Sequence, residues 1–109
     1  MQYIKESRSP EENARLEEFR RRVGRFTVSR RMVENDPVLW ATLLRGMCVV
    51  RTEAIYWGDC FEYVALSDQF DVTALGQVVP DYTAIITEHK LDDGRTAYDI
   101  VFEREGARQ

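Results

Sequence analysis

Hydrophobic residues near the start of the chain recur at the spacing of a helix. Leu16, Phe19, Val23 and Phe26 follow one another at intervals of three, four and three residues, which places them on one stripe of a helix. The preceding residues 9–12 offer a serine cap, a proline for the first turn and a glutamate for a capping box. The pattern predicts a long helix that packs this stripe on the core and ends within three residues after Phe26.

A second, shorter helix is predicted by the same combination of a cap and a proline. Asp36 can cap this helix, Pro37 suits its first turn, and Gly46 supplies a stop. The residues between them, 38–44, are mainly apolar, which favours a largely buried helix. Residues 1–46 are therefore expected to form the helical part of the protein.

The remainder of the chain, residues 47–109, is predicted to form strands. Valine, isoleucine, threonine and aromatic residues cluster there in runs separated by glycine, aspartate and proline. The runs predict four strands, at about residues 47–57, 60–66, 82–89 and 96–104. The expected fold is α+β, with two N-terminal helices, one long and one short, packed on a four-stranded, mostly antiparallel sheet of two hairpins. The length of 109 residues is usual for one domain, so we expect a single domain over 1–109.

The turn of the first hairpin sets its expected register. Gly58-Asp59 suits a two-residue turn, which would place Trp57 opposite Cys60. Cys48 then lies at the far end of the ladder from Cys60, so no disulfide can join the two thiols.

The second hairpin is expected to have a longer connection. Asp92-Asp93-Gly94 suits a three-residue loop with a glycine bulge. This loop aligns Ala84 with Phe102 and Ile86 with Ile100, which gathers apolar side chains on one face of the hairpin.

Composition is that of an ordinary globular domain, with 44% hydrophobic and 31% charged residues. No apolar run approaches the roughly 18 residues of a membrane span, and the N-terminal residues lack the apolar stretch of a secretory signal. We therefore expect a cytoplasmic protein that does not bind membranes. Thirteen arginines against two lysines suit a GC-rich coding sequence, which favours a bacterial or phage origin.

An arginine-rich segment raises the question of nucleic-acid binding. The candidate contacts to an anion or a nucleic acid are Arg20, Arg21, Arg22, Arg25, Arg30 and Arg31. Glutamates stand four residues before several arginines of this region, at the spacing of surface ion pairs. Residues 1–46 carry ten basic and seven acidic side chains, whereas residues 47–109 carry five and twelve, and this acidic half would repel phosphates. A salt-bridged surface is the favoured interpretation, and nucleic-acid binding is the alternative.

Aromatic residues of the first predicted hairpin suggest a contact surface. Alternation divides the hairpin into two sets with bulky side chains, of which only one can face the helices. The set Tyr56, Phe61 and Tyr63 is the candidate self-association face, because exposed apolar patches commonly mark interfaces. The expected function is a non-enzymatic protein-interaction module, with a homodimer or another protein as the partner.

Catalytic and metal-binding signals are weak. His89, the one histidine, lies near a predicted turn and diagonal to Asp99, so a small enzyme with a pocket lined by His89, Asp99 or Tyr63 is a further alternative. We expect no catalytic, cofactor-binding or metal-binding residues and no cofactor. The long connection 67–81 is interpreted as a crossover that packs Phe70, Leu75 and Val79 on the core, with a functional loop as its alternative.

Overall fold

The predicted α+β class is confirmed, with one more helix and one more strand than expected. The computed structural model describes residues 8–106. The elements in chain order are α1 (Pro10–Arg20), β1 (Val23–Ser29), α2 (Arg30–Asn35), α3 (Pro37–Leu43), β2 (Cys48–Ile55), β3 (Cys60–Leu66), β4 (Tyr82–Lys90) and β5 (Thr96–Arg104). The two unexpected elements are β1 and α2, and the other elements follow the expected order.

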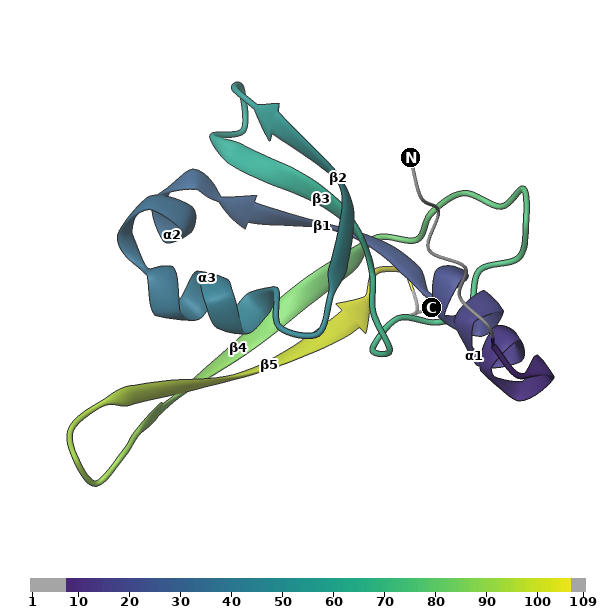
Figure 1. Cartoon of the computed structure of the whole chain (residues 1–109). Helices are drawn as coiled ribbons and strands as arrows, with labels where there is room; N and C mark the ends of the chain where they lie inside the picture. The colour runs from purple at the N-terminus through teal and green to yellow at the C-terminus, as the bar shows by residue number, and fades with distance from the viewer. Residues whose placement is uncertain (1–7, 107–109) are drawn as a thin grey trace, which may run out of the picture.

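The strands form two antiparallel sheets. Sheet A has the order β1-β3-β2, and sheet B is the hairpin of β4 and β5. A short parallel bridge between Arg25 and Asp81 joins them, and the Arg25 amide donates to the Pro80 carbonyl at 2.9 Å. From this junction the sheets diverge, and α2 and α3 lie between them, whereas α1 lies at the opposite end of the molecule (Figure 1). The single predicted sheet is thus split in two.

The prediction that the first helix continues past Phe26 is wrong. The helix ends at Arg20, and Val23–Ser29 forms β1, so residues 1–46 are not all helical. Gly24, Phe26 and Val28 are buried in alternation along this strand, which is the period of a sheet and not of a helix. Position 24 requires glycine for a steric reason, because a Cβ atom there would lie 2.8 Å from the Phe70 and Tyr82 rings.

The core is an aromatic cluster between the inner faces of the two sheets. Phe26 stacks on Tyr63 at a centroid distance of 5.6 Å and lies 5.1 Å from Phe102. Phe70 packs against Tyr82 at 4.5 Å and meets Phe102 edge-on at 5.3 Å. Such tilted and edge-to-face pairs add to the stabilisation from burial. The cluster joins β1, β3, β4, β5 and the long loop into one core.

The two hairpins differ in how well their registers were predicted. Ala84 faces Phe102 and Ile86 faces Ile100, as expected from the three-residue loop. In the first hairpin the turn has four residues instead of two, so Ile55, and not Trp57, faces Cys60. The positive φ of 49°, which glycine usually adopts in a tight turn, lies at Asp59 and not at Gly58. The turn assigned from Gly58 was therefore wrong.

The long connection between β3 and β4 is anchored to the core through the aromatic ring of Phe70. Phe70 is fully buried, as the crossover interpretation expects, but Leu75 is 89% exposed and does not pack on the core. Arg22 donates a hydrogen bond to the Phe70 carbonyl at 2.9 Å, and the Tyr82 hydroxyl accepts one from the Asp71 amide at 2.8 Å. These contacts anchor the loop around its aromatic residue.

Candidate self-association surface

Strand β2 is exposed on both faces. Every residue from Cys48 to Ala54 is exposed and only Ile55 is half-buried, although β3 beside it alternates between buried and half-buried positions. Val49 and Val50 are among the exposed apolar side chains, and the register with β3 shifts at Val50. Among residues 8–106, β2 pairs only with β3, so its other backbone edge is unpaired. Sheet A therefore extends one strand beyond the core.

The turn that follows β2 presents two aromatic side chains to solvent. Tyr56 is 88% exposed and Trp57 is 92% exposed, which is unusual for residues of this size. The turn itself is closed by a hydrogen bond from the Asp59 amide to the Tyr56 carbonyl at 3.3 Å. We call β2 together with Tyr56 and Trp57 the β2 surface.

The three residues predicted to form one association face do not share an environment. Tyr56 is exposed, but Phe61 is half-buried and packs against the core cluster. Tyr63 is only 5% exposed, and burial raises the pKa of its phenol. Tyr63 therefore cannot form part of an exposed face, because its side of the sheet is the side that the helices and the aromatic core cover.

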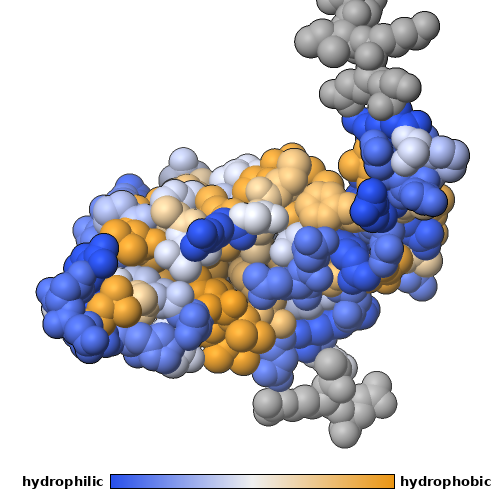
Figure 2. Space-filling model, turned by 60° about the horizontal axis from the view of Figure 1, so that its bottom comes forward, coloured by the Kyte–Doolittle hydropathy of each residue, from blue (hydrophilic) through white to orange (hydrophobic). Residues whose placement is uncertain are grey.

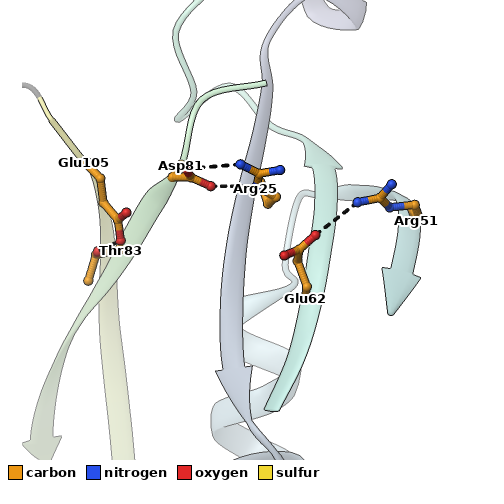
Figure 3. Close-up of polar contacts among 6 residues, drawn as sticks. All are labelled: Arg25, Arg51, Glu62, Asp81, Thr83 and Glu105. Atoms are coloured by element: carbon orange, nitrogen blue, oxygen red, sulfur yellow. Dashed lines mark hydrogen bonds and ion pairs between the residues drawn. The ribbon is translucent and has the colours of Figure 1, made fainter. Parts of the chain in front are cut away.

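The outer face of the sheets carries a row of charged and polar side chains (Figure 3). Arg51 binds Glu62 at 3.0 Å, and Arg25 binds both carboxylate oxygens of Asp81, at 2.6 and 3.2 Å. The hydrogen bonds from Arg25 hold the pKa of Asp81 below its usual value. Beyond Asp81, Thr83 on β4 donates to Glu105 at 2.8 Å. The centre of this outer face is thus polar. It is not the apolar surface that the alternation of bulky residues predicted.

Apolar residues elsewhere on the surface are divided by polar ones. Seen from the side of α3 and the β4–β5 hairpin, orange and blue residues alternate over the molecule, and the segment next to the grey N-terminal residues is mainly hydrophilic (Figure 2). On sheet B the exposed Ile85 faces the exposed Val101. This pair is flanked by Thr83, Glu103, Thr87 and Asp99 on the same face, so its apolar area is small.

The six candidate arginines do not form one basic surface. Arg20, Arg21 and Arg22 lie at the end of α1 and just after it, Arg25 lies on β1, and Arg30 and Arg31 begin α2. Four of them make ion pairs with acidic residues: Arg20 with Glu17, Arg22 with Glu18, Arg25 with Asp81, and Arg30 with Glu34. Arg21 donates to the Thr73 carbonyl at 3.3 Å. The cluster therefore supports local structure, above all the attachment of the long loop.

His89 and Cys48 are exposed, and Cys60 is half-buried. His89 lies 2.6 Å from an Asp99 oxygen, through the diagonal contact that the register predicted, and both side chains are exposed. Cys48 and Cys60 are free thiols, and the ladder pairs them with Leu66 and Ile55 respectively. Over residues 8–106, no group of three or more histidine, cysteine or acidic side chains is arranged to hold a metal ion. Tyr63, the third candidate for a pocket with His89, lies in the core.

Sequence reasoning identified only Tyr56 among the residues of the β2 surface, and it missed Trp57 and the exposed strand itself. Val49, Val50 and Glu53 were assigned to a strand, but the apolar pattern alone does not distinguish an edge strand from a central one. A weak signal exists, because Arg51-Thr52-Glu53 places charged residues on both sides of a threonine in a strand, and charges are common on edges.

Comparison with known protein families, curated proteins and solved structures found no match to this chain. Within the described residues, none of the helices is long and apolar enough to cross a membrane.

Proposed function

We propose that the protein is an interaction module that self-associates through the β2 surface. The observation that carries this proposal is the exposure of β2 on both faces, combined with its unpaired edge. An unpaired strand edge is a template for pairing with another chain. The proposal keeps the self-association expected from the sequence but moves the contact from the outer face to the edge of the sheet.

The aromatic tip supports the same assignment. Tyrosine and tryptophan are enriched among the residues that dominate binding energy at interfaces. Tyr56 and Trp57 follow β2 directly and project into solvent, with Val49 and Val50 exposed at the other end of the same strand. Burying these four side chains between two copies would supply the apolar area that strand pairing alone lacks.

The experiment that tests the proposal is light scattering coupled to size exclusion over a range of protein concentrations, at low and high salt. We expect a particle of twice the 12.8 kDa of one chain, and we expect it to persist at high salt because apolar contacts are not screened. The double variant Tyr56→Ser/Trp57→Ser should weaken the dimer by about tenfold or more.

The matched control is Leu75→Ser/Val78→Ser, which removes two apolar side chains of similar exposure from the long loop. This variant should dimerise like the wild-type protein because it leaves the β2 surface intact. A wild-type particle that stays at 12.8 kDa at several hundred micromolar would refute self-association.

A further inference from the structure

The edge of β2 is open along its central residues. The register shift at Val50 lies near the start of the strand, and from Arg51 to Ile55 the pairing with β3 is regular. Edge strands are often protected by proline, by bulges or by inward-pointing charges. Residues 48–55 contain no proline, and Arg51 and Glu53 lie on the outer face. The central residues can therefore accept a further strand.

The charges on β2 are not balanced within one chain. Glu53 lies directly opposite Glu62 on the outer face, and like charges in this position destabilise a sheet. Arg51 binds Glu62 at 3.0 Å, but Glu53 has no ion-pair partner in the described part of the chain, residues 8–106. A cation opposite Glu53 on the open edge would relieve this repulsion.

The geometry points to an antiparallel pairing of β2 with β2 of a second copy, about a two-fold axis at Thr52. This inference rests on the proposed self-association and specifies its register. Residues that face each other across a symmetric antiparallel pair must point to the same side of the sheet, so the axis passes through a residue. With the axis at Thr52, Arg51 of each copy faces Glu53 of the other, and sheet A becomes part of a six-stranded sheet.

Neighbouring registers are electrostatically unfavourable. An axis at Arg51 would set the two Arg51 side chains against each other, and an axis at Glu53 would do the same for the two Glu53 side chains. Both would oppose like charges directly across the new ladder. The register at Thr52 is the one of these three in which both charged residues of β2 meet an opposite charge.

The same register also accounts for the exposed apolar residues. In an antiparallel pair, the end of one strand lies beside the beginning of the other. Tyr56 and Trp57 of each copy would then approach Val49 and Val50 of the other copy. The polar centre of the interface would set the register, and its two apolar ends would supply most of the buried area.

Charge-reversal variants test the register directly. In the Arg51→Glu variant every Arg51–Glu53 contact becomes two acidic groups, and in Glu53→Arg it becomes two basic groups. We expect each variant alone to dimerise at least about tenfold more weakly than the wild-type protein. An equimolar mixture should recover wild-type affinity to within about threefold, because the heterodimer pairs opposite charges at both contacts. Sedimentation equilibrium measures the affinities.

The control for charge alone is Arg15→Glu, which makes the same change at an exposed residue of α1, far from β2, and should leave dimerisation unchanged. Recovery in the mixture also shows that both variants are folded. If either charge reversal leaves the affinity of dimerisation unchanged, or if the mixture does not recover wild-type affinity, the register is overturned but self-association stands. A monomeric wild-type protein overturns both proposals.

A cysteine cross-link provides a second test that does not depend on charge. Facing residues of an antiparallel pair have Cα atoms about 4.5–5.5 Å apart, which is within the range of a disulfide. In a chain carrying Cys48→Ser and Cys60→Ser, the further change Thr52→Cys should give a covalent dimer under mild oxidation. Thr27→Cys, on the outer face of β1, is the matched control and should not cross-link. A dimer that forms without cross-linking through residue 52 contradicts the inference.

Discussion

β2 and β3 are neighbours in one sheet, and they differ in what surrounds them. β3 is paired on both sides, and Tyr63 and Ala65 on its inner face are buried in the core. β2 is paired on one side and has no buried residue. The difference comes from position in the sheet, since both strands are rich in apolar residues. The core strand determines stability, whereas the edge strand holds a surface that is available to another chain.

The largest effect on stability is expected where the core is densest, away from β2. Phe70→Ala removes a fully buried ring that contacts Tyr82 and Phe102, and it should lower the free energy of unfolding by about 3–5 kcal/mol. Val50→Ala on the edge should change it by less than about 0.5 kcal/mol. Urea unfolding of both variants measures the contrast. Equal losses would show that β2 contributes to the core as much as the long loop does.

Gly24 provides a smaller test on β1, the other edge of sheet A. Gly24→Ala forces a Cβ atom into the Phe70 and Tyr82 rings, at 2.8 Å in the present geometry. We expect a loss of about 1–3 kcal/mol from overpacking. Gly58→Ala is the matched control, because the closest contact of its Cβ atom would be the Cys60 sulfur at 3.3 Å, a milder contact with the end of a side chain, and its backbone does not require glycine. Thermal unfolding compares the two, and an unperturbed Gly24→Ala variant would mean that the junction of the sheets is loosely packed.

The ion pair between Arg25 and Asp81 joins β1 to the start of sheet B. The ion pair of β2, between Arg51 and Glu62, joins it only to β3. Because the folded-state pKa of Asp81 lies below its ordinary value, its stabilisation is present above about pH 4 and is lost as the pH falls through the folded pKa. Asp81→Asn should lower the free energy of unfolding by about 1 kcal/mol or less at pH 7, since the pair is partly exposed. The difference from wild type should shrink as the pH falls and disappear below the folded-state pKa of Asp81. A difference that grows on acidification would refute this sign.

The arginines should give the smallest effect. Five of the six candidate residues are engaged by acidic side chains or by the long loop, so little positive potential is left for phosphates. We expect no retardation of labelled duplex DNA or single-stranded RNA at micromolar protein and low ionic strength. Retardation that disappears with added salt would restore nucleic-acid binding as a function.

Local turn chemistry explains which parts of the fold could be predicted from the sequence. Asp92-Asp93-Gly94 specifies a single loop, so the second hairpin was predicted with its correct register. The α3 helix was predicted from its Asp36 cap, whose oxygen accepts the Leu39 amide at 3.1 Å. Both features depend on residues that are close in the sequence.

β1 was missed because its stabilising contacts are distant in the sequence. Val23 and Phe26 fit the helical stripe that begins at Leu16, yet Phe26 pairs with Tyr63 on β3. Local spacing cannot reveal this long-range pairing. The same limit applies to the candidate site, because strand order decides that β2 is an edge and that Tyr63 faces the core. Only the exposure of Tyr56 could be anticipated, and Tyr63 was assigned to the wrong environment.

Hydrogen exchange at different protein concentrations tests the central claim most directly. If two copies pair through β2, amides of Cys48–Ile55 that point outward in the monomer become hydrogen-bonded in the dimer. Their protection should rise with protein concentration, while the amides of β5, the outer strand of sheet B, stay unchanged. Protection in β2 that is independent of concentration, in a sample that light scattering shows to be dimeric, would place the interface elsewhere and contradict the account.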